Sequence, residues 1–200
     1  PVAAYNLTNT YTALKTDTNA DGIGDTLTTC SGDISVTLDA NGNANVTWSN
    51  LFVCDNDVFG TGYYIDESSY GISFWKEGMT NPVVMNGIVD QNGDGVFTVI
   101  SGYLYDPYSL IYKRKGMSSH PQIGFDVLNN IYLTYSAVSE TSDTNTYSAQ
   151  YRHIFLTYSG DGGNTWATPT DITSSQTQEG LWPSIAKSNA ATIGLVYQRD

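Results

Sequence analysis

The fold is decided by the stretch Ser159-Gly160-Asp161-Gly162-Gly163-Asn164-Thr165-Trp166, which fits the pattern S-x-D-x-G-x-T-W at every defined position. It follows a predicted strand, His153 to Tyr158, so it stands where a hairpin turn is expected. Glycines such as Gly163 permit the positive φ angles of a tight turn. The Asp161 carboxylate is suited to accept hydrogen bonds from loop amides, with Ser159 and Thr165 adding hydroxyl groups. We therefore expect a structural turn, covered by Trp166, rather than a catalytic aspartate.

The segments around this turn contain a repeat. The residues His120-Pro121-Gln122-Ile123 match Trp182-Pro183-Ser184-Ile185, which lie 62 residues later, and the match continues without a gap. A looser copy lies 87 residues before the first, where Val36 and Val46 take the places of Ile123 and Leu133. Each copy predicts a strand, a turn and a second strand. Three similar hairpins favour the blades of a β-propeller, and a β-sandwich with chance similarity is the alternative.

The rest of the chain is also predicted to form strands. Short runs rich in β-branched and aromatic residues alternate apolar with polar side chains, and Asn-Gly or Asp-Gly turn signals separate them. No stretch has a convincing apolar stripe of helical period. The fold class is therefore all-β. The clearest predicted strands are Ile34 to Leu38, Ala44 to Trp48, Ile131 to Tyr135 and Ile154 to Tyr158.

With the pattern of residues 159–166, which is known as the Asp-box, the chain resembles the sialidase-like (BNR-repeat) family of β-propellers. The resemblance covers residues 118–200 well and residues 31–85 weakly. Residues 71–78 look like a second Asp-box strand pair that lacks the Asp-Gly-Gly core. The resemblance implies antiparallel four-stranded blades, with the Asp-box at the blade periphery and away from the active site.

A complete propeller of this family has more blades than this chain offers. We therefore expect a fragment of a longer protein, with further blades supplied by the same or another chain. Residues 1–30 would form an N-terminal strand and a calcium-type loop, and residues 31–117 degenerate blades. Residues 118–200 would form the Asp-box blade and the start of the next blade.

Catalysis of the sialidase type requires arginines that the repeat does not carry. The family binds the substrate carboxylate through arginines, the first in a Tyr-Arg-Ile-Pro-like motif. The corresponding places here, residues 118–121 and 180–183, hold no arginine. The residues at those places do not replace a bidentate guanidinium clamp. We assign no catalytic residue, and we interpret His120 and His153 as packing or surface residues.

The charge balance excludes some partners. Eight Lys and Arg against 20 Asp and Glu give a net charge of −12, with a pI near 4.2. A nucleic-acid backbone requires a basic surface, so we expect no nucleic-acid partner. The apolar runs are too short for a transmembrane helix, so we expect no membrane insertion. An acidic chain rich in Asn, Thr, Ser and Tyr is typical of a secreted or cell-surface protein.

The two cysteines are too few for a disulfide scaffold. Cys30 and Cys54 would close one loop if the protein folds in an oxidising compartment, and we predict that disulfide. Two unpaired buried thiols are the alternative.

Two acidic loops predict structural calcium. Residues 17–25 have the pattern D-x-N-x-D-G-x-x-D, with oxygen ligands at alternate positions and a glycine for the sharp turn. This loop resembles those of thrombospondin type 3 repeats and FG-GAP blades. A shorter loop at residues 90–95 is the weaker prediction, and solvated acidic turns are the alternative. The predicted ligands are Asp17, Asn19, Asp21, Ile23 and Asp25 in the first loop, and Asp90, Asn92 and Asp94 in the second.

Fifteen Tyr and four Trp residues are suited to stack on sugars as well as to fill cores. We therefore predict a non-catalytic, calcium-stabilised binding module for a glycan or an extracellular protein. One alternative is a fragment of an exo-sialidase-like glycoside hydrolase whose catalytic residues lie mostly outside this chain. The other is a structural scaffold in a surface assembly.

Overall fold

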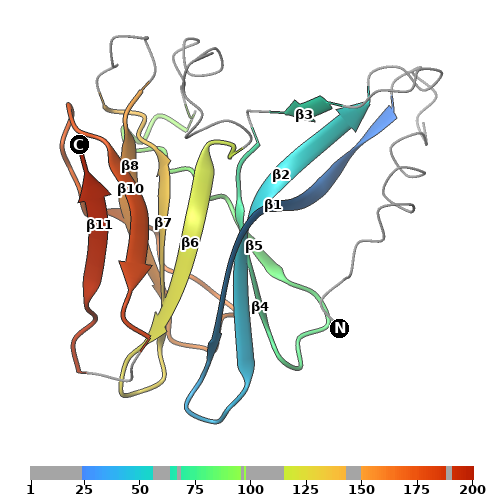
Figure 1. The fold of residues 1–200 in the computed structure, drawn as a ribbon, viewed down its shortest axis with the longest axis vertical. Coiled ribbons are helices and arrows are strands. Elements are labelled where there is room, and N and C mark those ends of the chain that lie inside the picture. Colours follow the sequence, from blue (N-terminus) through green and yellow to red (C-terminus); the bar gives the residue numbers. More distant parts are fainter. Residues whose placement is uncertain are drawn as a thin grey trace.

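The computed structural model describes residues 24–55, 64–66, 69–95, 97, 115–142, 150–187 and 191–200. These residues form antiparallel strands and no helix, so the prediction of an all-β chain is confirmed (Figure 1). No helix long and apolar enough to span a membrane occurs among them.

The first sheet is formed by the strands that lie between residues 24 and 85. It comprises β1 (Gly24–Leu38), β2 (Ala44–Asp55), β4 (Ile72–Lys76) and β5 (Val83–Met85), in that order. The short strand β3 (Tyr64–Asp66) pairs with the far end of β2. The third strand of the sheet, β4, lies within residues 71–78, the segment whose sequence resembles an Asp-box strand pair.

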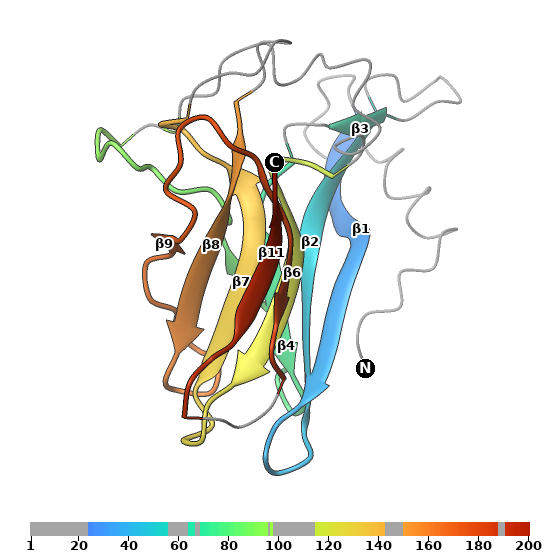
Figure 2. The ribbon, with the colours of Figure 1, turned by 60° about the vertical axis from the view of Figure 1, so that its left-hand side comes forward.

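The second sheet has four strands in sequence order. They are β6 (Ser118–Phe125), β7 (Ile131–Val138), β8 (Arg152–Ser159) and β9 (Thr170–Asp171). A third hairpin consists of β10 (Gly180–Ile185) and β11 (Leu195–Arg199), and β10 contacts the second sheet (Figure 2).

The three hairpins share one register, as the sequence repeat predicts. Val36 pairs with Val46 in the first, Ile123 with Leu133 in the second, and Ile185 with Leu195 in the third. These are equivalent positions at offsets of 87 and 62 residues. The repeat therefore corresponds to one structural unit, and β1, β6 and β10 are its first strands, which we call the lead strands.

The turns of the first two hairpins are built in the same way. In the first, Asp39 Oδ1 accepts hydrogen bonds from the amides of Asn41 and Asn43, both at 2.9 Å. In the second, Asp126 Oδ1 accepts from Leu128 and Asn130, also at 2.9 Å. An aspartate at the turn start thus replaces missing backbone partners in both hairpins.

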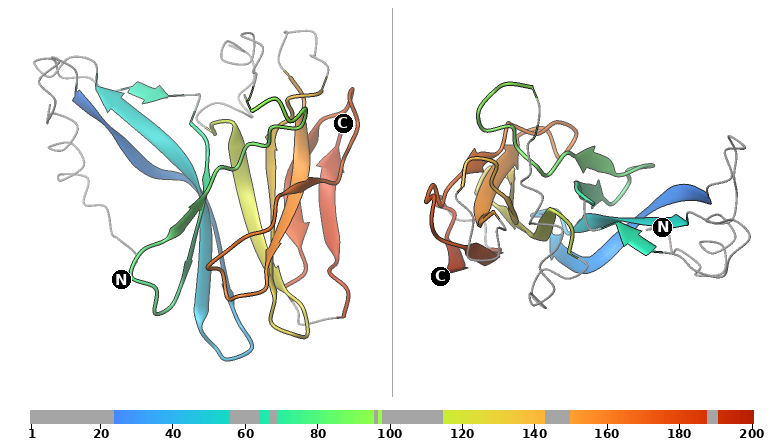
Figure 3. Two further views of the ribbon diagram at one scale, coloured as in Figure 1. Left: turned by 180° about the vertical axis from the view of Figure 1, so that it is seen from behind. Right: turned by 90° about the horizontal axis from the view of Figure 1, so that it is seen from above.

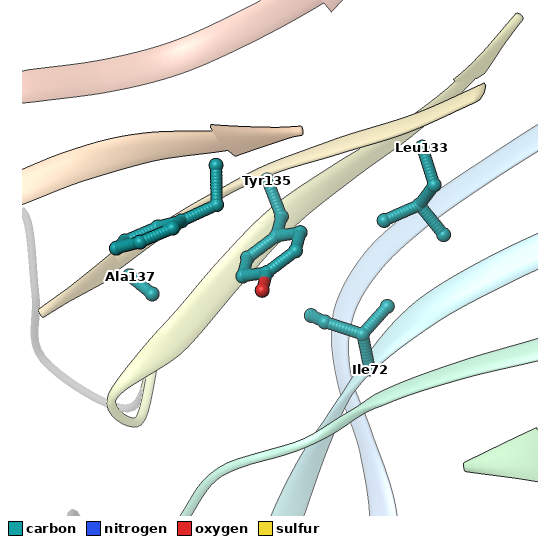
Figure 4. Close-up of a cluster of buried hydrophobic side chains, with 5 residues drawn as sticks. Ile72, Leu133, Tyr135 and Ala137 are labelled. Atoms are coloured by element: carbon teal, nitrogen blue, oxygen red, sulfur yellow. The ribbon is translucent and has the colours of Figure 1, made fainter. Parts of the chain in front are cut away.

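The first and second sheets pack face to face through apolar side chains. Ile72 of β4 lies in one buried cluster with Leu133, Tyr135 and Phe155 of the second sheet (Figure 4). Phe74, also on β4, lies in a neighbouring cluster with Ile123. Figure 3 shows the two sheets from behind and from above, with the first sheet in blue to green and the second in yellow to orange.

Gly163 of the Asp-box lies directly against this interface. Its φ is 93°, and a Cβ atom added there would collide with the ring of Phe74. Trp166 packs edge-on against the same ring, with centroids 5.2 Å apart, and donates from Nε1 to the Gly163 carbonyl at 3.1 Å. Only glycine satisfies both the backbone conformation and the close approach.

We expect Gly163→Ala to lower the free energy of unfolding by about 2–4 kcal/mol, because it adds overpacking to an unfavourable φ. Gly162→Ala is the matched control, since Gly162 also has a positive φ, 77°, but has open space around it. We expect Gly162→Ala to lower the free energy of unfolding by only about 1 kcal/mol. Urea denaturation of both variants measures the difference, and equal losses would contradict the packing described here.

Candidate functional site

Each lead strand is interrupted by a bulge near the same place. The register shifts between Cys30 and Ile34 in β1, between Ser119 and Gln122 in β6, and between Leu181 and Ser184 in β10. The last two bulges occupy identical positions of the repeat. Bulges re-aim side chains and are common beside functional sites.

The bulged residues have an unusual backbone. His120 has a φ of 53° and Trp182, its equivalent in the next repeat, has a φ of 47°. A residue other than glycine in this region costs about 1–3 kcal/mol, and such residues cluster at active and binding sites. The third equivalent position, in β1, is Asp33, which directly follows Gly32 with a φ of 90°.

Contacts between the lead strands bring these equivalent residues together. Strand β6 contacts both β1 and β10. The His120 amide donates to Asp33 Oδ2 at 3.4 Å, and its Nε2 lies 4.0 Å from Asp33 Oδ1. The rings of His120 and Trp182 meet edge to face, with centroids 6.3 Å apart. Lys115, just before β6, forms an ion pair with Asp33.

We call Asp33, Lys115, His120 and Trp182 the lead-strand cluster. It combines an ion pair, an imidazole and an indole that is 40% exposed. The cluster can therefore present the flat apolar ring of Trp182 to a ligand, together with the carboxylate of Asp33 and the ammonium group of Lys115. We did not predict this cluster, although the sequence contains the signal: the offsets that align Pro121 with Pro183 also align His120 with Trp182 and Asp33.

The imidazole in this cluster is held neutral. Burial is the main reason that the pKa of His120 falls to about 4, and the positive charges of Lys115 and Arg152 act in the same direction. The Asp33 carboxylate opposes this shift but does not overcome it. At pH 7 the ion pair of Asp33 and Lys115 is therefore the charged part of the cluster.

Arg152 supports the cluster from inside the protein. Its side chain is 1% exposed, and its guanidinium donates to Ser119 Oγ at 3.0 Å and to the Gly116 carbonyl. Ser119 borders the bulge of β6, and Gly116 lies two residues before this strand begins. The arginine thus fixes the start of this lead strand, rather than projecting from the surface.

One predicted calcium loop lies within the described residues. Carboxylate oxygens of Asp90 and Asp94 come within 4.8 Å of one another and of Glu140, which lies far away in the sequence. Asp90 also accepts hydrogen bonds from the amides of Gly93 and Gly95, both at 2.7 Å, which closes the loop. Three carboxylates of this kind suit a hard cation.

The structure describes only some of the other predicted calcium ligands. Asp17, Asn19, Asp21 and Ile23 lie outside the described residues, and Asp25 is described only as part of the backbone of β1. Asn92 lies in the second loop, where its Oδ1 accepts from the Asp94 amide at 2.9 Å. Glu140 is the ligand candidate that we did not predict, because nothing local in the sequence brings it to this loop.

The structure places the Asp-box residues in one turn between β8 and β9. Ser159 donates to Asp161 at 2.8 Å, and Asp161 accepts from the amide and the hydroxyl of Thr165 at 2.9 and 2.6 Å. These bonds, led by the Thr165 hydroxyl, lower the pKa of Asp161 to about 2. Every one of these bonds is local, within four residues of Asp161.

The predicted disulfide between Cys30 and Cys54 is wrong. Cys30 is a free thiol, and its partner across the β1–β2 ladder is Asn50. Cys54 lies four residues further along β2, which is about 13 Å at roughly 3.3 Å per residue. A disulfide requires Cα atoms within about 7 Å. Burial raises the pKa of the Cys30 thiol.

His153 is buried in β8 and is engaged in structure. Its Nδ1 lies 2.5 Å from Asp171 Oδ2, an oxygen that also accepts from the Gln91 side chain at 3.1 Å. This network ties β9 to the loop that carries Asp90. It agrees with a packing role for this histidine.

Comparisons with known proteins leave the family open. No family model and no curated protein matches the chain. Among solved structures, the chain is similar to the Hadza microbial sialidase Hz136, with 12% sequence identity and a TM-score of 0.37. The match covers 74% of this chain and 28% of the sialidase, so the chain spans under a third of that protein. Since a TM-score below 0.5 does not establish a shared fold, the architecture described above rests on the chain's own sheets.

We expect the His120 imidazole to titrate near pH 4, well below the usual value of 6.5. Because the unfolded chain binds this proton more readily, His120 makes the folded protein gain stability as the pH rises from about 4 to 6.5. Proton NMR of the His120 ring across this range measures the midpoint, with His120→Gln to assign the signal. A midpoint at or above 6.5 would show that the ring is not buried as described.

Proposed function

We propose that this protein is a non-catalytic binding module for glycans and that the lead-strand cluster is its binding site. The observation that carries the proposal is the meeting of three equivalent positions of the repeat, Asp33, His120 and Trp182. Two of them have a strained backbone. Strain of this kind persists where function requires a side chain to be held in one direction.

The exposed indole of Trp182 supplies the apolar half of a sugar site. Sugars present flat patches of C–H groups, which pack on an aromatic face, and tryptophan offers the largest such face. The neighbouring His120 ring holds the indole edge to face and thereby limits its rotation. A rigid aromatic loses little conformational entropy when it binds a ligand.

The polar half comes from the ion pair. The side chains of Asp33 and Lys115 are 11% and 28% exposed, so both still reach solvent. A carboxylate accepts hydrogen bonds from sugar hydroxyl groups, and an ammonium group donates to them. A few convergent polar groups beside an apolar surface are what small-molecule sites usually present.

The position of Arg152 supports binding rather than sialidase chemistry. A carboxylate clamp needs an accessible guanidinium, whereas the bonds of Arg152 to Ser119 and Gly116 are internal. Ser119 and Leu181 stand where the sialidase motif would carry an arginine. We therefore favour neutral sugars as ligands over acidic ones.

We expect Trp182→Ala to weaken glycan binding at least about thirtyfold, as for an aromatic anchor worth about 2 kcal/mol. Val196→Ala is the matched control, because Val196 is 69% exposed on the same hairpin and lies outside the cluster. A glycan array identifies the ligand, and calorimetry then compares the two variants. Equal affinity of Trp182→Ala and the parent protein, or release of a hydrolysed sugar, would contradict the proposal.

We also propose that calcium stabilises the loop of Asp90, Asn92 and Asp94, with Glu140 as a further ligand. If 1 mM calcium is near a hundredfold excess over its dissociation constant, Tm should rise by about 5–10 °C. Asp94→Asn should remove the part of this rise due to the second loop, while Asp200→Asn, at an exposed site, should not change it. Differential scanning calorimetry with calcium or with EGTA measures the effect. A full calcium response in Asp94→Asn would exclude this loop.

A secreted or cell-surface location is part of the same proposal. It is supported by the acidic composition and by the exposed aromatic site. Fractionation of the source cells, followed by immunodetection, would test it. Protein confined to the cytosol would contradict it.

A further inference from the structure

Gln91 lies inside the proposed calcium loop and joins this loop to two distant segments. Three of its polar groups form hydrogen bonds to residues that are 48 to 80 positions away in the sequence. The partners are Ser139 and Glu140, in the turn after β7, and Asp171 in β9. The side chain of Gln91 therefore lies where the three segments meet.

The contacts with the turn fix the carboxylate of Glu140. The backbone amide of Gln91 donates to Glu140 Oε2 at 3.0 Å, and Ser139 Oγ donates to Gln91 Oε1 at 2.7 Å. A second glutamine, Gln150, holds the same turn by donating to the Glu140 carbonyl at 3.0 Å. A carboxylate accepts several hydrogen bonds, so Glu140 can contact Gln91 and a cation together. Because its side chain is already ordered, less conformational entropy is lost when calcium binds.

The third contact of Gln91 reaches β9. Its Nε2 donates to Asp171 Oδ2 at 3.1 Å, the oxygen that also lies 2.5 Å from His153 Nδ1. Strand β9 has two residues and pairs with β8 at Phe155 and Leu156. A strand so short depends on contacts outside its own ladder, and regions with few such contacts open first. The bond from Gln91 is therefore part of what holds β9 on the second sheet.

One amide group makes both side-chain contacts, and this links the two segments. Oε1 and Nε2 of Gln91 are the two ends of a planar group, so its orientation toward Ser139 also sets its orientation toward Asp171. Displacement of the 139–142 turn would thus weaken the contact with β9, and displacement of β9 would weaken the contact with the turn. Residues that hold metal ligands from behind commonly influence metal affinity in this way.

We propose that Gln91 couples calcium binding at Asp90, Asp94 and Glu140 to the closure of β9 on β8. This coupling rests on the calcium site proposed above and adds a regulated element to it. Bound calcium holds β9 in place, and the contact with β9 in turn raises the calcium affinity, because coupling of this kind is reciprocal. Gln91 is a positioning residue, since its side chain contacts the neighbouring segments rather than the cation.

Calorimetric titration with calcium tests the effect of the contact on affinity. We expect Gln91→Leu to weaken calcium binding about tenfold, as the loss of a partner behind a metal ligand does. Gln178→Leu is the matched control, because Gln178 accepts a hydrogen bond from nearby Ser175 at 3.3 Å, in the segment after β9. Its calcium affinity should equal that of the parent protein. The binding compared is the part that Asp94→Asn removes.

Amide hydrogen exchange measured by NMR tests the effect of calcium on β9. The Ile172 amide, directly after β9, donates to the Ile154 carbonyl at 2.9 Å and reports on this strand. The Ala186 amide, which donates to the Gly194 carbonyl at 2.8 Å in the third hairpin, is the internal control. We expect calcium to slow exchange at Ile172 at least about fivefold, with no change at Ala186. In Gln91→Leu, calcium should leave exchange at Ile172 unchanged.

The outcomes separate the coupling from the calcium site. If Asp94→Asn binds calcium as the parent protein does, the site itself is wrong and the coupling fails with it. If Asp94→Asn loses binding but Gln91→Leu and Gln178→Leu bind equally well, the site stands and the coupling is overturned. Equal slowing at Ile172 and Ala186 in the parent protein, or no slowing at Ile172, would also overturn it. This last comparison holds whether or not Gln91→Leu folds.

Discussion

Burial of Ile72 and Phe74 under the second sheet is the interaction on which the rest of the structure depends. These two side chains of β4 join both apolar clusters between the sheets, and both are fully buried. Full burial of such side chains contributes about 1.5–3 kcal/mol each. Because the same clusters hold Leu133 and Tyr135, they also fix how the first sheet is placed on the second. The meeting of the lead strands depends on that placement.

Much of the fold could be predicted from the sequence because the repeat and the strand period act locally. Equivalent positions such as Val36 and Ile123 pair with equivalent partners, so the register follows once the turns are aligned. The prediction failed for Cys30 and Cys54, because strand register depends on bulges and on how far a ladder continues. The strands β1 and β2 run past the predicted hairpin ends, to 15 and 12 residues, and keep the two cysteines apart along the ladder.

The candidate site was harder to predict for a different reason. Asp33, His120 and Trp182 stand at ordinary strand positions in the sequence, and the register shifts beside them are not visible there. A positive φ is uncommon for any residue other than glycine, so no propensity argument predicts it at His120 and Trp182. Glu140 could not be predicted either, because it is about 50 residues away in the sequence and only the folded chain brings it close to Asp90 and Asp94. By contrast, the local bonds of Asp161 follow from residues within one turn.

The proposed function depends on two separate sets of contacts. Apolar side chains on the facing surfaces of the first and second sheets hold these sheets together. On the lead strands, the equivalent residues Asp33, His120 and Trp182 contact one another through His120. Lys187 also donates from the end of β10 to Ser35 of β1, at 3.1 Å, so the third hairpin contacts the first sheet directly.

The most direct test of this account is a nuclear Overhauser measurement between the rings of His120 and Trp182 in the folded protein at neutral pH. The ring centroids are 6.3 Å apart, edge to face, so their nearest protons should give a clear cross-peak. The account predicts that cross-peak, together with its loss in Trp182→Ala. If the assigned ring protons show no contact in a folded sample, the lead strands do not meet as described and the proposed site does not exist.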